Sequence, residues 1–191
     1  MREVRRGDWI QTFTGRQFWP LDPRADEIDI IDIAAGLSRE CRFAGHCLRF
    51  YSVAEHSALM YRAAKARGVE RRTLRAVLLH DASEGLGLRD IPRPIKRDLA
   101  NYKTIEAAVM AAVAMRFDFA WPLDAVVKQL DEAIGQAEEA QNMAPPPMPW
   151  RGKPKLPFEA ATPLDVRLEY WPPDRALIEF LSAAAELGLL R

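Results

Sequence analysis

Helical patterning runs through the middle of this sequence and limits the fold more than any other feature. Between residues 52 and 142, apolar side chains recur at intervals of three and four, as on the inward faces of amphipathic helices. Ser52 and Glu55 form a capping-box pattern ahead of a helix that we expect to reach Arg67, where Gly68 ends it. The pattern predicts a bundle of helices.

Other segments complete this prediction. Asp32, Thr73 and Asp124 stand where N-caps of three further helices are expected. Alternating residues around Thr14-Gly15 predict a short strand pair within residues 11–22. We expect five further helices, over about residues 33–40, 74–81, 103–117 and 125–141 and after Pro172. Prolines between 144 and 163 predict a long surface loop. The sequence therefore predicts one all-α domain over residues 1–191, with a minor N-terminal β element.

Composition removes several classes of protein. The 27 basic and 27 acidic residues balance, so the chain has no overall basic field for nucleic acid or a membrane surface. The charged N-terminus leads into no apolar signal core, and we expect a cytoplasmic protein without a membrane span. Cys41 and Cys47 match neither a redox motif nor a zinc-knuckle spacing, and we expect both as small buried residues.

Residues that bind metals fall on predicted inward faces. Of the three histidines, His56 occupies an apolar helix stripe, and His80 is followed directly by Asp81 near the end of the next predicted helix. Asp131 lies on the apolar stripe of a later helix, where an unpaired carboxylate is costly to bury. The residues alone leave two interpretations open: a divalent-metal site in the bundle interior, or separate core residues that each satisfy a local hydrogen bond.

Several stretches of the chain, in this order, resemble one known family. His56, the pair His80-Asp81 and the distant Asp131 resemble the H…HD…D signature of the HD-domain metal-dependent phosphohydrolases. The stretches FYSVAEHS, LLHDASE, DIPRPIK and VVKQLDEA are similar to the 5′-deoxynucleotidase branch of that family. TFTGRQFWPLDP, DIAAGLS and CRFAGH resemble a subgroup that contains phage dATP triphosphohydrolases and a related nucleotide-analogue phosphohydrolase. The resemblance covers about residues 9–142.

The resemblance implies an HD-type helical bundle with a divalent metal ion, which is Co, Mn, Zn, Ni or Mg. Glu84 and Asp90 are the implied general acid and base, and a second interpretation makes Glu84 a hydrogen-bond partner of a histidine. Such a metal lowers the pKa of bound water and polarises a phosphoryl oxygen. The implied metal ligands are His56, His80, Asp81 and Asp131.

Cations and aromatic residues in the same motifs are the candidates for substrate binding. For Arg16 and Arg93 a surface ion pair is an equal alternative, and for His46 a structural role is the alternative. Trp19, with Phe18, either stacks on a base or belongs to the core. The full set expected to contact substrate is Arg16, Trp19, Arg42, His46, Arg93 and Lys96.

Two positions depart from the family pattern. Asp90 stands one residue farther from Asp81 than in the commoner family arrangement, which affects its implied catalytic role. Ala35 occupies a position where many relatives have a histidine, and if that histidine contacts substrate, this protein differs from them there.

The resemblance thus implies a phosphohydrolase that uses metal-activated water to remove the 5′ phosphate or polyphosphate from a deoxynucleotide, with dATP- or dAMP-like substrates favoured. A 5′-deoxynucleotidase that accepts only monophosphates is one alternative. A catalytically idle nucleotide sensor that keeps the metal is another, and a purely structural helical protein is a third. The expected partner is a small-molecule nucleotide, with no nucleic acid and no membrane, and the chain is either a monomer or a homo-oligomer.

Overall fold

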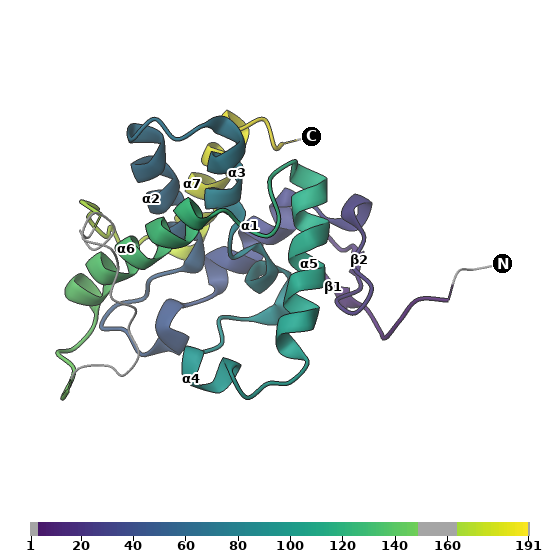
Figure 1. Cartoon of the computed structure of the whole chain (residues 1–191), viewed down its shortest axis with the longest axis horizontal. Coiled ribbons are helices and arrows are strands. Elements are labelled where there is room, and N and C mark those ends of the chain that lie inside the picture. Colours follow the sequence, from purple (N-terminus) through teal and green to yellow (C-terminus); the bar gives the residue numbers. More distant parts are fainter. Residues whose placement is uncertain (1–3, 149–163, 191) are drawn as a thin grey trace.

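The computed structural model describes residues 4–148 and 164–190, and this part of the chain is mostly helical (Figure 1). Its helices are α1 (Ile30–Arg39), α2 (Val53–Ala66), α3 (Arg71–Leu79), α4 (Arg93–Lys96), α5 (Tyr102–Phe117), α6 (Ala125–Asn142) and α7 (Pro173–Glu186). The shorter elements are strands β1 (Ile10–Gln11) and β2 (Gln17–Phe18) and turns η1 (Ala25–Glu27), η2 (Arg42–Gly45) and η3 (Glu84–Leu88). The predicted all-α fold with a minor β element is confirmed. Most of the predicted proline-rich loop lies outside the described residues.

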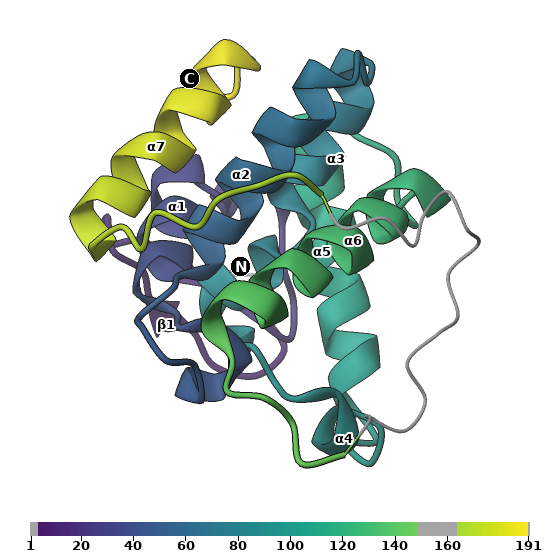
Figure 2. The ribbon, with the colours of Figure 1, turned by 90° about the vertical axis from the view of Figure 1, so that its left-hand side faces the viewer.

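The central element is α2, which packs against α1, α3, α6 and α7 (Figure 2). All nine residues from Val53 to Tyr61 are buried, so the first half of α2 is enclosed on every side. The sequence predicted only one inward stripe. Burial on all sides explains why this half contains alanine, serine and a histidine in place of exposed charged residues, because neighbouring helices leave no face to solvent.

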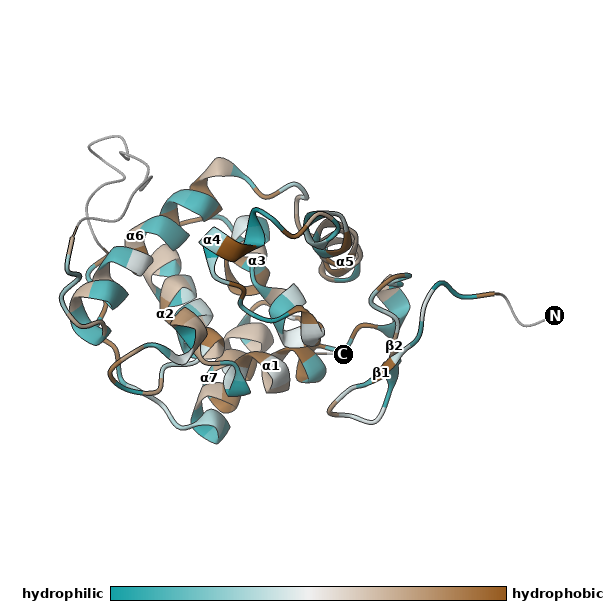
Figure 3. Cartoon of the chain, turned by 90° about the horizontal axis from the view of Figure 1, so that it is seen from below, coloured by the Kyte–Doolittle hydropathy of each residue, from teal (hydrophilic) through white to brown (hydrophobic). Residues whose placement is uncertain are grey.

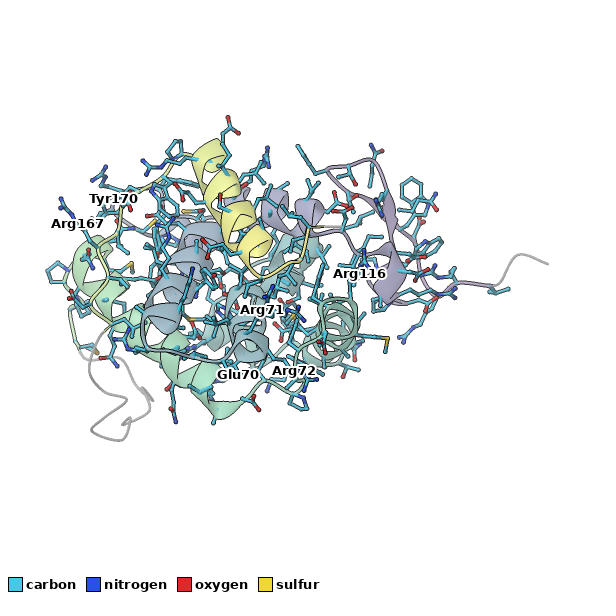
Figure 4. All side chains as sticks on the ribbon, turned by 90° about the horizontal axis from the view of Figure 1, so that it is seen from above. Glu70, Arg71, Arg72, Arg116, Arg167 and Tyr170 are labelled. Carbon is cyan, nitrogen blue, oxygen red and sulfur yellow. The ribbon has the colours of Figure 1, made fainter. Side chains whose placement is uncertain are left out.

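The capping box predicted at the start of α2 forms only in part. Ser52 Oγ accepts a hydrogen bond from the backbone N–H of Glu55 at 3.1 Å, as expected. The Glu55 carboxylate does not return to Ser52. It accepts the backbone N–H groups of residues 169–171 at 2.7 to 2.8 Å, where the segment that leads into α7 crosses α2 (Figure 2). The neighbouring Tyr170 lies beside α6, and its hydroxyl donates to the carbonyl of Gln141 at 3.1 Å (Figure 4).

Two predicted N-caps are wrong by three residues. Helix α1 begins at Ile30 and is capped by Asp29, and α3 begins at Arg71 and is capped by Glu70. In both helices a carboxylate three residues before the predicted cap accepts a free N–H group of the first turn. Asp32 is instead buried and accepts hydrogen bonds from the backbone and hydroxyl of Thr14, at 2.7 and 2.9 Å. It thereby ties the β hairpin to α1.

The stripe predicted on α6 is confirmed. Hydrophilic and hydrophobic residues alternate around this helix (Figure 3), and the predicted inward positions are all buried, namely Val127, Leu130, Ile134 and Ala137. Asp124 stands at the N-cap position, although its side chain forms no capping hydrogen bond. In the described part of the chain, no helix combines the length and apolar character that a membrane span requires.

Helix α1 and turn η3 approach each other through their backbones. A Cβ atom at Gly36 would collide with the carbonyl oxygen of Gly85, and a Cβ atom at Gly85 would lie 2.6 Å from the carbonyl oxygen of Ile33. Only glycine fits at both positions. This contact fixes η3, which begins at Glu84, against the wall that α1 forms.

We expect Glu55→Ala to lower the free energy of unfolding by about 3 kcal/mol, because buried N–H groups of the segment before α7 would lose their acceptor. Urea denaturation followed by circular dichroism measures this change. Glu132→Ala on α6 is the control, since its side chain forms no hydrogen bond or ion pair with the described residues. Equal stability of the two variants would contradict the anchoring role of Glu55.

Candidate metal centre

Three helices bring the candidate metal ligands together. His56 comes from the enclosed half of α2, His80 caps the end of α3, and Asp131 comes from α6. Because α2 and α3 pack against each other and both contact α6, the three side chains converge. One ligand atom from each side chain lies within 4.8 Å of the other two. We call His56, His80 and Asp131 the metal group.

The distances within the metal group suit one ion. Nε2 of His56 lies 3.1 Å from Nε2 of His80 and 3.4 Å from Oδ1 of Asp131, and Nε2 of His80 lies 3.8 Å from the same oxygen. Ligands that share one ion at bond lengths near 2.1 Å lie about 3 to 3.5 Å apart. The group needs only a small contraction to hold a metal ion.

Hydrogen bonds on the far side of each ring define how the two imidazoles face each other. Nδ1 of His80 lies 2.8 Å from the carbonyl oxygen of Val77, which only accepts, so this nitrogen carries a proton. Nδ1 of His56 lies 2.6 Å from a carboxylate oxygen of Glu138, which requires the same tautomer. In the neutral rings both Nε2 lone pairs therefore point into the same 3.1 Å gap. A cation between them removes this repulsion.

Neighbouring carboxylates make the gap attractive to positive charge. Burial lowers the pKa of His80, but Asp81 and Asp131 outweigh burial and raise this pKa well above its usual value. Protons and metal ions are therefore both drawn to these nitrogens, and a bound metal displaces the protons.

Asp81, the fourth predicted ligand, lies beside the metal group. Its Oδ2 atom is 3.2 Å from Nε2 of His80 and 3.9 Å from Nε2 of His56. The same oxygen is 3.5 Å from Nη1 of Arg42, so the carboxylate is shared between this arginine and the metal group. Burial raises the pKa of Asp81, but His80 outweighs burial and lowers this pKa to about 2. Asp81 is therefore charged and able to complete the ligand set.

Sequence reasoning missed Glu138. This carboxylate is fully buried, and it accepts from the Tyr51 hydroxyl at 2.8 Å and from Nε of Arg42 at 3.1 Å in addition to its bond with His56. It lies seven residues after Asp131, on the same inward face of α6. The sequence did offer a signal for Glu138, because it is an acidic residue on the apolar stripe of α6, two turns after the candidate ligand Asp131.

The implied acid and base occupy η3 and the loop that follows it. Glu84 is buried, and its Oε2 atom has no hydrogen-bond partner among the described residues. Burial, together with the charges of Asp81 and Asp90, raises the pKa of Glu84 well above its usual value. Burial also raises the pKa of Asp90, whose backbone N–H lies 3.4 Å from Oε1 of Glu40. Burial and the charges of Asp81 and Asp90 both favour the protonated form of Glu84.

Two predicted substrate residues have partners near this region. Arg42 reaches both Asp81 and Glu138, as described above. Lys96 on α4 donates to Glu106 at 2.6 Å, and its Nζ atom lies 5.0 Å from the centre of the Tyr102 ring. Arg93 is exposed on α4.

The remaining predicted substrate residues lie apart from this network. Arg16 pairs with Asp29 at 2.9 Å, and the ring of Trp19 is covered by a guanidinium group 5.0 Å away. His46 is exposed at the end of η2. No hydrogen bond or ion pair links any of the three to the metal group in the described part of the chain. Phe18 is fully buried, so the suggestion that it stacks on a base is wrong, because the core encloses its ring.

Two bacterial proteins are similar to this chain. Over 123 residues it is 37% identical to the uncharacterized protein YfdR of Escherichia coli K12, which covers 64% of this chain and 66% of YfdR. Over 144 residues it is 35% identical to the uncharacterized protein RCAP_rcc00048 of Rhodobacter capsulatus, which covers 71% of this chain and 73% of that protein. The match to YfdR thus spans slightly less than two thirds of that protein. No family model matches the chain.

We expect Glu138→Gln to weaken metal binding about tenfold to a hundredfold. An amide accepts the hydrogen bond from the His56 ring less strongly than a carboxylate does, and it carries no negative charge to offset that of the cation. Isothermal titration of the purified chain with Mn²⁺ measures the affinity. Glu132→Gln, the same exchange on the same helix, is the control and is expected to bind Mn²⁺ as the parent chain does. Unchanged affinity in Glu138→Gln would show that this carboxylate does not orient the ring.

Proposed function

Because this chain belongs to the same family as the uncharacterized Rhodobacter capsulatus protein RCAP_rcc00048, whose name states no activity, we propose its function from the site. We propose a metal-dependent phosphohydrolase that removes the 5′ phosphate or polyphosphate from deoxynucleotides. The observation that carries this proposal is the pair of imidazole nitrogens that face each other across 3.1 Å beside Asp131. The sequence resemblance to the HD-domain phosphohydrolases supports the same reaction.

The donor set favours particular metals. Two imidazoles with one or two carboxylates suit Mn, Co, Ni or Zn better than Mg, which prefers oxygen ligands and retains its waters. Held by His56, His80 and Asp131, and by Asp81 at the edge, a divalent ion supplies two things: a bound water of lowered pKa and a positive charge beside the phosphoryl oxygens. Hydrolysis of a phosphate ester also requires a proton for the leaving oxygen.

Glu84 is suited to supply that proton. Its carboxyl is buried, its pKa is raised well above the usual value by burial and by the charges of Asp81 and Asp90, and one of its oxygens has no partner among the described residues. Asp90 is the second carboxyl of the same region, and it is suited to receive a proton from water. Because η3 is fixed against α1 by the contact of two glycines, Glu84 keeps its place as substrate enters.

Arg42 and Lys96 are the proposed phosphate contacts. In the free chain the charge of Arg42 is balanced by Glu138 and Asp81, and that of Lys96 by Glu106. A phosphate near the metal group offers both side chains a stronger acceptor than a carboxylate that is already shared. Acceptance of a triphosphate, preference for adenine and preference for deoxyribose rest on the sequence resemblance alone.

We expect Asp131→Asn to lose bound metal and phosphohydrolase activity together while it keeps its helical circular dichroism spectrum. Elemental analysis of the purified chain gives the metal content, and phosphate release gives the activity. Asp124→Asn is the matched control, because it makes the same exchange on the same helix at a side chain without a capping bond. Full turnover by Asp131→Asn would exclude this metal site.

A product panel tests the reaction itself. With Mn²⁺ present, we expect dATP to yield deoxyadenosine and inorganic triphosphate, because attack of water at the α-phosphorus with the 5′ oxygen of deoxyadenosine as leaving group keeps the three phosphates together. Release of pyrophosphate only would show that the bond between the α- and β-phosphates breaks and would contradict this expectation. Chromatography of deoxynucleoside and ribonucleoside mono- and triphosphates identifies the products. Hydrolysis of monophosphates only would indicate a 5′-deoxynucleotidase. Metal binding without any turnover would indicate a sensor and would overturn the proposed activity.

A further inference from the structure

Two thiols meet at the edge of the site. Cys41 and Cys47 were predicted to be small buried residues, and both are instead partly exposed. Their sulfur atoms lie 3.6 Å apart, in direct contact. Neither thiol is a member of the metal group or takes part in the proposed hydrolysis.

The backbone between the two cysteines turns back on itself. Phe43, Ala44 and Gly45 all have positive φ angles, of 57°, 51° and 79°, and together they reverse the chain direction. The backbone N–H of Arg42 donates to the carbonyl of Tyr51 at 2.9 Å on one side of the turn. On the other side the N–H of Leu48 donates to the carbonyl of Asn142 at 2.8 Å. The contact between the thiols is therefore imposed by the fold.

We propose that Cys41 and Cys47 are a modification site, at which a low-molecular-weight disulfide converts the two thiols into a disulfide within the chain. Both cysteine residues are partly exposed, which gives the reagent access. The sulfurs must approach from 3.6 Å to about 2.05 Å for the bond to form.

The disulfide forms by two successive thiol–disulfide exchanges. One cysteine thiolate attacks a sulfur of the small disulfide, forms a mixed disulfide and releases one small thiol. The second cysteine then attacks the protein sulfur of the mixed disulfide and releases the second small thiol. The protein loses two protons and two electrons, and the small disulfide gains both as it becomes two thiols. Burial raises the pKa of Cys47, which slows the exchange because the thiolate is the reactive form, so oxidation is followed over hours.

Arg42 gives the modification a consequence. It follows Cys41 directly, and its guanidinium group reaches Glu138 at 3.1 Å and Asp81 at 3.5 Å. A bond across the turn pulls on the backbone that carries this arginine, so its position beside Asp81 shifts. This step rests on the proposed function, in which Arg42 contacts phosphate.

Peptide mapping tests the modification without any assay of activity. The full chain is incubated with oxidised glutathione, its free thiols are alkylated, and it is digested with trypsin under non-reducing conditions. Because trypsin cleaves after arginine, a disulfide at this site joins peptide 40–42 to peptide 43–49. We expect this linked pair to dominate and to disappear with dithiothreitol, and Cys47→Ser not to form it. Alkylated cysteines, a stable mixed disulfide or linkage between two chains would overturn the proposal.

Kinetics test the consequence separately. We expect the oxidised chain to show a KM for dATP raised about threefold to tenfold, reversed by dithiothreitol, because a charge-assisted contact of Arg42 is weakened. The double variant Cys41→Ser, Cys47→Ser, which has no thiol to react with oxidised glutathione, is expected to keep the KM of the untreated chain. An unchanged KM in the oxidised chain would overturn the coupling to Arg42. Absence of turnover in every form would refute the proposed function, whereas the peptide map would still decide the modification.

Discussion

Two imidazole nitrogens that face each other across 3.1 Å set the requirements for the rest of this structure. His56 must come from a helix that is enclosed on every side, because only then do its neighbours fix both ends of its ring. Glu138 from α6 holds one end, and His80 at the end of α3 meets the other. The packing of α2 among four helices is therefore also the assembly of the site.

Charge explains why the interior tolerates so many polar groups. Asp81, Asp131 and Glu138 bring three carboxylates to the region around His56, and Arg42 supplies one fixed positive charge. Burial of unpaired carboxylates is costly, so the surplus draws protons to the histidines or a metal ion to the gap between them. One divalent cation held by these side chains would balance the surplus negative charge.

Whether an interaction could be predicted from the sequence depends on how far apart its partners lie along the chain. Helical spacing placed His56 and Asp131 on inward faces, because a stripe is a local property. The bond from Glu55 to the backbone of residues 169–171 joins segments more than a hundred residues apart, and a capping box predicts a different partner. Glu138 was missed for a similar reason, because the side chains to which it forms hydrogen bonds, His56 on α2 and Arg42 in η2, are far from it in the sequence. The metal group could be anticipated, whereas its supports depended on tertiary packing.

The contact between Gly36 and Gly85 bears on how relatives with the same site are recognised. Histidine and aspartate ligands alone describe a metal-binding bundle, and many different pockets can be built around one. The two glycines instead allow a close approach of α1 and η3 that a larger side chain at either position would prevent. A homologue that keeps the ligands but replaces either glycine must hold its η3 carboxyl elsewhere. Such a chain is expected to have diverged in the chemistry it performs, even where its metal is retained.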